Sequence, residues 1–226
     1  PVKVGAPYID YATGLNAAFA VMAALRERDR TGEPQTVDIS MLDTALNLMA
    51  NNLVTVATTG EDVPKLGNEA ASGSPSSGCF VAADGVNIML AANNERQFVD
   101  LCAVLGHPEW SQDPRWAVPK VRRDHFDALR SEIAKAFLSR PAAVWETILD
   151  AQGVPASRVR SLSELLGEGQ PQARGLLATL PVGSEQTKVR LPAIGFRLNG
   201  HNLPPTRPPK SVGADNERWL PDEKTV

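Results

Sequence analysis

The chain has 226 residues, of which 22% are charged, and its formal net charge is -3 at pH 7. A chain of this length can bury a substantial core in one or two domains. The charge balance gives no basic field for a nucleic-acid partner, and the longest apolar run, Ala17 to Leu25, is too short to cross a bilayer. We therefore expect a cytoplasmic protein without nucleic-acid or membrane partners.

The first predicted element is a helix from Asp10 to about Asp29. Asp10 stands where an N-cap is expected, because its carboxylate can accept hydrogen bonds from first-turn N–H groups. The next residues, 15–25, are apolar on nearly every face, which predicts a buried helix. The residue types leave two alternatives for Asp10: a helix cap only, or a reacting carboxylate beside a helix terminus.

A strand and a second helix are predicted next. Residues 35–40 alternate and are β-branched, which favours a strand. Ser40 and Asp43 form a capping-box pattern, so we expect a helix from there to about Ala57. The order helix, strand, helix is typical of an α/β layer architecture.

A glycine- and serine-rich stretch follows a short linker at residues 60–64. It covers residues 67–78 and lacks the Gly-Lys-Ser/Thr ending of a phosphate-binding loop. Its composition alone is typical of a flexible connector.

The middle of the chain predicts a hairpin and three helices. The hairpin turns at residues 83–85, and helices are expected at about 92–105, 122–138 and 141–152. We expect Ser139 to cap the last of these helices and Pro141 to lie in its first turn.

The remaining segments predict mainly short strands. Residues 154–159 are a predicted strand, and Ser161 begins a capping box with Glu164. Further strands are expected at residues 176–180, 189–191 and 194–198, and the proline-rich stretch 204–209 is expected to be extended.

The cysteines and histidines predict no metal site. Cys79 and Cys102 have no CxxC spacing, and the three histidines show neither an HExxH motif nor an i,i+4 pair. We expect neither a bound metal nor a disulfide framework.

Four ordered blocks near the start resemble family III coenzyme A transferases of the formyl-CoA and carnitine CoA-transferase (CaiB/BaiF-like) type. The blocks are VGAPYIDYATG at residues 4–14, AALRER at 23–28, RTG at 30–32 and QTVDISMLD at 35–43, and the resemblance continues more loosely to Pro221. It implies an α/β fold with a Rossmann-like large domain, present in part, a small α+β domain, and an interlocked homodimer.

The resemblance also implies a domain division. Residues 1–64 would be part of the large CoA-binding domain with the catalytic aspartate, residues 65–140 the small domain, and residues 141–226 a C-terminal return to the large domain. Family members carry a long N-terminal region ahead of the first block, whereas this chain starts at Pro1. We therefore expect a fragment, a processed chain or one piece of a split subunit, with a missing N-terminal segment or partner chain.

The same resemblance assigns site residues. Asp10 takes the place of the nucleophile, Met41 lies near the bound CoA thioester, and Ser72, Gly73 and Ser74 belong to a loop that covers the active site. The implied reaction transfers CoA from an acyl-CoA thioester to a carboxylic acid through aspartyl anhydride and aspartyl-CoA intermediates. Coenzyme A enters as substrate, and no other cofactor is implied.

Two other functions stay open. An α-methylacyl-CoA racemase of the same fold would use Asp10 as an acid/base group and a glutamate for which Glu95 is the candidate, since Glu95-Arg96-Gln97-Phe98 partly matches the racemase block. Racemases are glycine-rich after the aspartate, whereas Tyr11 follows it here, so we favour the transferase. A non-catalytic subunit is the third possibility, and the sequence does not identify the acids exchanged.

Overall fold

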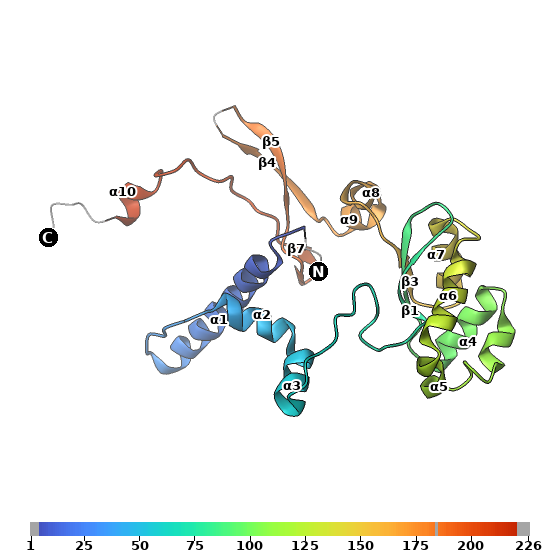
Figure 1. Cartoon of the computed structure of the whole chain (residues 1–226). Helices are drawn as coiled ribbons and strands as arrows, with labels where there is room; N and C mark the ends of the chain where they lie inside the picture. Colours follow the sequence, from blue (N-terminus) through green and yellow to red (C-terminus); the bar gives the residue numbers. More distant parts are fainter. Residues whose placement is uncertain (1–4, 184, 221–226) are drawn as a thin grey trace.

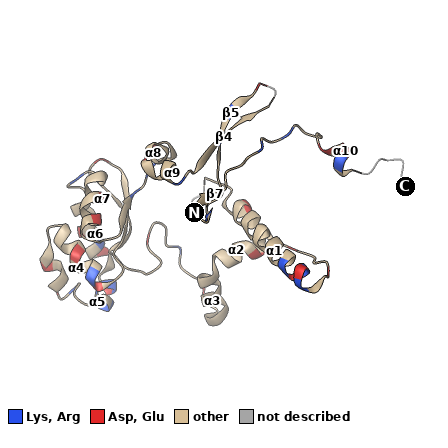
Figure 2. Cartoon of the chain, turned by 180° about the vertical axis from the view of Figure 1, so that it is seen from behind, with Lys and Arg blue, Asp and Glu red and all other residues tan. Residues whose placement is uncertain are grey.

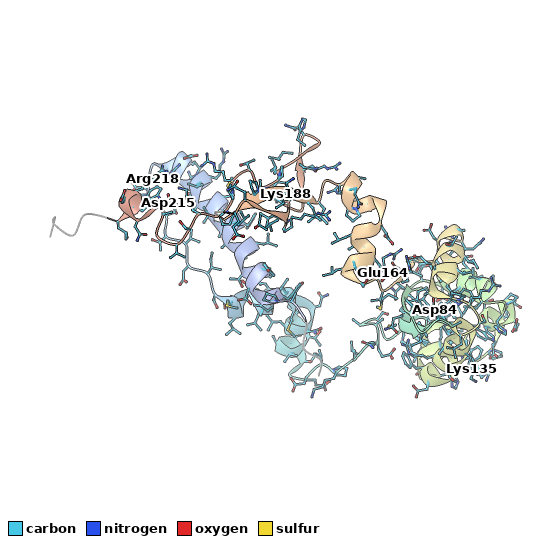
Figure 3. The ribbon with its side chains drawn as sticks, turned by 90° about the horizontal axis from the view of Figure 1, so that it is seen from above. Asp84, Lys135, Glu164, Lys188, Asp215 and Arg218 are labelled. Carbon is cyan, nitrogen blue, oxygen red and sulfur yellow. The ribbon has the colours of Figure 1, made fainter. Side chains whose placement is uncertain are left out.

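The computed structural model describes residues 5–183 and 185–220 (Figure 1). Val4 in the first block and Pro221 at the end of the resemblance lie outside these residues. The chain opens with three helices: α1 (Tyr8–Thr31), α2 (Met41–Leu48) and α3 (Ala50–Thr59). Figures 1 and 3 show them apart from a compact unit, residues 67–158, and that unit holds the hydrophobic core.

The compact unit combines a three-stranded sheet with helices. Its elements are β1 (Ser77–Val81), β2 (Asn87–Ala91), α4 (Glu95–Val104), the 3-10 helix η1 (Pro108–Gln112), α5 (Pro119–Asp124), α6 (Phe126–Phe137), α7 (Ala142–Ala151) and β3 (Ala156–Arg158). The strand order is β1-β2-β3 and both pairings are antiparallel. The expected hairpin is confirmed, with Val81 opposite Asn87.

The core forms on one face of this sheet, because alternate strand residues point the same way. Phe80, Ile88 and Leu90 are almost fully buried there. The Phe80 ring stacks on Phe137 of α6 at 5.2 Å between ring centroids, and Phe137 meets the Trp145 ring of α7 edge-on at 5.3 Å. These contacts anchor both helices on the sheet.

The core does not stop at residue 140, where the sequence places a domain boundary. Ala142, Trp145 and Leu149 of α7 are buried in it, as is Val154 just before β3. The Trp145 indole N–H donates to the Phe137 carbonyl at 2.9 Å. Since α7 covers the same sheet face as α6, the two helices belong to one packed unit.

The start of α7 is capped from the hairpin turn. The Asp84 carboxylate accepts the Ala142 N–H at 3.1 Å and the Val86 N–H at 3.2 Å. The expectation that Ser139 caps this helix is wrong, because the Ser139 hydroxyl donates back to the Ala136 carbonyl at 2.7 Å. Pro141 is the N-cap residue instead of lying in the first turn. In Figure 3 Asp84 lies within the compact unit.

The expected helix starting at Asp10 and the strand at 35–40 are both wrong in detail. Pro7 is the N-cap of α1, so Asp10 is the third helical residue, and α1 has no side-chain cap hydrogen bond. Residues 35–40 form no strand and pair with no segment that the structure describes. A strand needs a hydrogen-bonded neighbour, which no described segment provides here.

Helix α1 is also not buried, although its sequence predicted burial. None of its residues is buried, and Phe19 is 74% exposed. The Ser40 cap is confirmed, since its hydroxyl accepts the Leu42 and Asp43 N–H groups. The expected second helix is split at Met49 into α2 and α3.

The C-terminal part is made of short elements: α8 (Leu162–Gly167), α9 (Gly169–Ala173), β4 (Leu177–Val182), β5 (Thr187–Pro192), β6 (Arg197–Leu198), β7 (His201–Asn202) and α10 (Asn216–Trp219). The capping box of Ser161 and Glu164 is confirmed. Strands β4 and β5 form an antiparallel hairpin that projects from the chain in Figure 1. Of the strand expected at 194–198, only β6 forms.

An ion-pair network joins the compact unit to the C-terminal part. Arg160 binds Glu146 of α7 at 2.7 Å and Glu168 at 2.5 Å, and Arg158 lies 3.4 Å from each of these carboxylates. The hydrogen-bonded Arg160 guanidinium holds the pKa of Glu146 below its ordinary value. The network therefore favours the ionised form of Glu146 in the folded chain.

We expect Asp84→Ala to lower the free energy of unfolding by about 1–2 kcal/mol, because it removes the cap of α7. Asp84→Asn keeps a capping oxygen and should stay close to wild type. Thermal unfolding followed by circular dichroism measures both. Equal melting temperatures for Asp84→Ala and wild type would contradict the capping role.

We expect the free energy of unfolding of Glu146→Gln to fall less steeply than that of wild type as the pH is lowered. The pKa of Glu146 is lowered on folding, so its stabilisation is complete above the unfolded value of about 4.3 and is lost as the pH falls below it. Urea unfolding at pH 6, 5, 4 and 3 measures this. Parallel curves for the variant and wild type would show that Glu146 does not contribute to the acid sensitivity.

Candidate functional site

Asp10 lies in the first turn of α1 and is exposed. Among the residues that the structure describes, its carboxylate takes part in no hydrogen bond or ion pair. The unpaired N–H groups of the first helical turn create a positive end, which stabilises negative charge near Asp10. A carboxylate without a protein partner at such a position is available to a substrate.

The helix that carries Asp10 packs on the helix that begins with Met41. The Asn16 amide of α1 donates to the hydroxyl of the buried Thr44 of α2 at 3.3 Å. Asn16 follows Asp10 by six residues, which is about 9 Å along a helix. The structure therefore brings the elements of Asp10 and Met41 together, and Met41 is 49% exposed.

The loop expected over the active site belongs to the compact unit. We call residues 67–78 the serine loop. Figures 1 and 3 show this unit apart from α1 and α2, so the structure does not bring Ser72, Gly73 and Ser74 to the helices of Asp10 and Met41. A surface hollow of about 580 Å³, lined by residues of β2, β3 and the end of α7, includes neither Asp10 nor Met41 nor any of the three loop residues.

The hydrogen bonds of the serine loop argue against a flexible connector. Ser76 is fully buried, and its hydroxyl donates to the Ala92 carbonyl at 2.8 Å. The Ser72 and Ser77 hydroxyls both donate to the side-chain oxygen of Asn93, at 3.0 and 2.8 Å. Its composition suggested a mobile segment, but the hydroxyls find acceptors on the backbone and on Asn93.

Arg130 of α6 binds the end of this loop. Its guanidinium donates to the carbonyls of Ser77 and Cys79, at 3.2 and 2.9 Å, and pairs with Glu69 at 3.0 Å. Neither Asn93 nor Arg130 was found from the sequence. The only signal for Asn93 was its place at the start of a predicted helix, and Arg130 lies 53 residues from Ser77.

Gly78 lies between the two residues whose carbonyls bind Arg130. A Cβ atom at Gly78 would lie 2.9 Å from the Asn68 carbonyl oxygen and 3.2 Å from an Arg130 nitrogen. Its φ of +124° is also a conformation that other residues rarely adopt. Glycine is therefore required for this close approach.

Glu95, the candidate racemase glutamate, is held in an ion pair. Both of its oxygens accept from the Arg122 guanidinium, at 3.1 and 2.9 Å. The Arg122 side chain is only 6% exposed and lies over the Phe98 ring at 3.5 Å. These contacts give Glu95 a structural partner.

Neither cysteine is a candidate nucleophile. Burial raises the pKa of the Cys102 thiol to about 12 and also raises the pKa of Cys79. Both thiols are therefore protonated near neutral pH. Within the described ranges, no three side chains of His, Cys, Asp or Glu gather where they could hold a metal ion.

Charged side chains are sparse over much of the N-terminal part of the chain. Figure 2 shows acidic and basic residues on α4, α5 and α6, whereas the basic residues of α1 gather at its C-terminal end. Exposed apolar side chains include Tyr11, Leu15 and Phe19 of α1 and Leu42 of α2. No helix across the described ranges combines the length and apolar character needed to span a bilayer.

The fold of the chain matches solved structures of CaiB/BaiF-type proteins. The chain aligns with the crystal structure of an aspartate-to-alanine variant of the Rv3272 protein from Mycobacterium tuberculosis, with a TM-score of 0.80 and 25% identity, over 98% of this chain and 57% of that one. A CaiB/BaiF family protein from Brucella suis aligns with a TM-score of 0.74 and 25% identity, over 90% of this chain and 52% of that one. The mixed α/β fold is thus confirmed.

The chain belongs to CoA-transferase family III, whose family model matches residues 1–216. It is 31% identical to the succinate–glutarate CoA-transferase of Agrobacterium fabrum, over 100% of this chain and 56% of that protein. It is 29% identical to the acetyl-CoA:oxalate CoA-transferase of Acetobacter aceti, over 92% of this chain and 52% of that protein. The chain therefore spans about half the length of these relatives.

We expect Gly78→Ala to destabilise the chain by about 3 kcal/mol or more, because the new methyl group meets backbone in a strained conformation. Gly73→Ala is the matched control. Its φ is +64°, and its Cβ would meet only the Arg123 Cδ at 3.9 Å, so we expect a loss of about 1–2 kcal/mol. Chemical denaturation measures both, and equal losses would contradict the close packing at Gly78.

Proposed function

We propose that this chain carries the nucleophile of an enzyme that transfers CoA from an acyl-CoA thioester to a carboxylic acid. The observation that carries the proposal is Asp10: an exposed carboxylate without a partner among the described residues, at the positive end of α1, in a chain of CoA-transferase family III. The family implies acyl-CoA substrates. No metal or further cofactor is part of the proposal.

The proposed reaction has four steps. The Asp10 carboxylate attacks the thioester carbonyl of the donor, which forms a mixed anhydride and releases CoA thiolate. The thiolate attacks the aspartyl carbonyl of the anhydride, which releases the donor acid and leaves an aspartyl-CoA thioester. The acceptor carboxylate attacks that thioester to give a second anhydride, and the freed thiolate attacks the acceptor's acyl carbon and regenerates Asp10.

An aspartate suits this sequence because its anhydride and its thioester both keep the carbonyl activated, whereas an ester to serine would not. The α1 N-terminus would stabilise the carboxylate that is regenerated in the last step. In this proposal Met41 lies near the thioester. The serine loop, with Ser72, Gly73 and Ser74, would cover the substrate, and its small residues would avoid a clash with the thioester.

The racemase alternative has less support. It needs Glu95 as a proton-transfer group, and both Glu95 oxygens are occupied by Arg122. A proton acceptor must be within hydrogen-bond reach of the substrate proton, and this ion pair would have to open first.

The relatives suggest which acids to test. The names of the Agrobacterium and Acetobacter enzymes contain succinate, glutarate and oxalate, which are short dicarboxylic acids. We propose that this chain serves an acceptor of the same class.

We further propose an assembly. Residues 1–64 would form part of a large CoA-binding domain, and the compact unit would be the small domain, which then extends past residue 140 to include α7 and β3. The C-terminal strands would return to the large domain. The exposed apolar side chains of α1 to α3 would be covered by the rest of the enzyme in a homodimer with interlocked chains, which light scattering on the full-length protein would test.

We expect Asp10→Asn to reduce CoA transfer by orders of magnitude in the full-length protein, because an amide cannot form the anhydride. Stability should fall by less than about 1 kcal/mol, since the side chain is exposed and only its interaction with the helix dipole is lost. The measurement combines transfer rates from succinyl-CoA to short dicarboxylic acids with mass spectrometry after hydroxylamine or borohydride trapping.

In wild type, trapping should label the peptide that contains Asp10 and no other. Asp29→Asn, at the far end of the same helix, is the control and should keep full activity. Full activity of Asp10→Asn would remove the nucleophile assignment. Exchange of an α-proton of a branched acyl-CoA with deuterated water, without a label on Asp10 and with loss in Glu95→Gln, would establish the racemase instead.

A further inference from the structure

A buried hydroxyl lies between the helix of Asp10 and the helix of Met41, which are side by side in Figure 1. Within helices α1 to α3, all of which the structure describes, Thr44 of α2 is the one buried residue. Its hydroxyl accepts the Asn16 amide of α1 at 3.3 Å and donates to the Ser40 carbonyl at 3.0 Å. The hydroxyl thus uses its donor within its own helix and an acceptor position across to α1.

On α2 this contact lies within one turn of Met41. Ser40 immediately precedes Met41, and its hydroxyl accepts two first-turn N–H groups as the cap of the helix. Met41 and Thr44 are three residues apart, so their side chains lie on the same face of α2. Asn16 therefore binds α2 on the face and at the turn that carry Met41.

On α1 the same contact lies about 9 Å along the helix from Asp10, so a tilt of α1 by about 6° about this point moves Asp10 by about 1 Å. Half-buried residues on either side of the contact, Ala12 and Ala17, have small side chains. Small side chains form shallow ridges, which limit the rotation of one helix over another less than large interlocking ones do. The hydrogen bond between Asn16 and Thr44 is therefore a directional contact that can fix the tilt of α1.

We propose that Asn16 and Thr44 are positioning residues for CoA transfer, because their hydrogen bond sets the place of the Asp10 carboxylate relative to Met41. This inference rests on the proposed function, which takes Asp10 as the nucleophile and Met41 as a neighbour of the thioester. A displacement of the attacking group by about 1 Å can cost about 100-fold in rate. Since Thr44 is only 4% exposed, water does not readily replace Asn16 as the donor to its hydroxyl.

The test compares variants of the full-length protein. Thr44→Val removes the hydroxyl at nearly unchanged size, Thr44→Ser keeps it, and Asn16→Leu removes the donor. Thr55→Val is the matched control. The Thr55 hydroxyl of α3 also donates to the carbonyl four residues earlier, that of Asn51, at 3.0 Å, but no other group among the described residues binds it.

We expect kcat to fall by about 10- to 100-fold in Thr44→Val and in Asn16→Leu, with little change in KM for acyl-CoA. The rate of Asp10 adduct formation in a single turnover should fall in parallel, because the displaced group is the nucleophile. The double variant should be no slower than the slower single variant, since both changes remove the same contact. Thr44→Ser should retain most of the wild-type kcat, and Thr55→Val should stay near wild type.

Three results would overturn the proposal. They are a wild-type kcat in Thr44→Val, losses that multiply in the double variant, and a Thr44→Ser variant as slow as Thr44→Val. If Thr44→Val does not fold, Asn16→Leu decides, because Asn16 is exposed, and a wild-type kcat in that variant overturns the proposal. If wild type neither transfers CoA nor forms an Asp10 adduct, the proposed function falls and this inference with it; that outcome is distinct, because it is read in wild type before any variant is compared.

Discussion

The guanidinium of Arg130 joins the core of the compact unit to the serine loop. It lies between the Phe80 ring of the core and the serine loop, and it binds carbonyls at the point where the loop becomes β1. An unpaired buried carbonyl is costly, so the loop cannot leave this position without losing those bonds. Gly78 is the matching constraint, because any side chain there would displace the backbone or Arg130.

The two halves of the expected site differ in how far this chain stabilises them. The compact unit closes its own core, with Phe80, Phe137 and Trp145 in mutual contact. Among the described residues, a hydrogen bond between Asn16 and Thr44 joins α1 to α2, and many apolar side chains of α1 to α3 are exposed. Burial of apolar surface is the main source of stability, so the geometry around Asp10 depends on what covers these helices.

Local chemistry made much of the secondary structure predictable from the sequence. The turn at Asp84-Gly85 and the caps at Ser40 and Ser161 depend on nearby residues, and all three are confirmed. The cap at Asp10 was wrong because Pro7 ends the preceding segment and starts the helix earlier. The hydrogen bonds that Asn93 and Arg130 make with Ser77 join residues 16 and 53 positions apart, and nothing in the local sequence indicates them.

The serine loop shows why composition misled the prediction of flexibility. Glycine and serine are common in linkers because they are small and polar, but these properties also permit close packing. Here Gly78 admits the Asn68 carbonyl and Arg130, and Ser76 is buried because its hydroxyl has an acceptor. In the proposed reaction, a loop that approaches a thioester without clashing needs the same small residues. The residues around the loop therefore hold it in place, and the absence of large side chains within it permits this close packing.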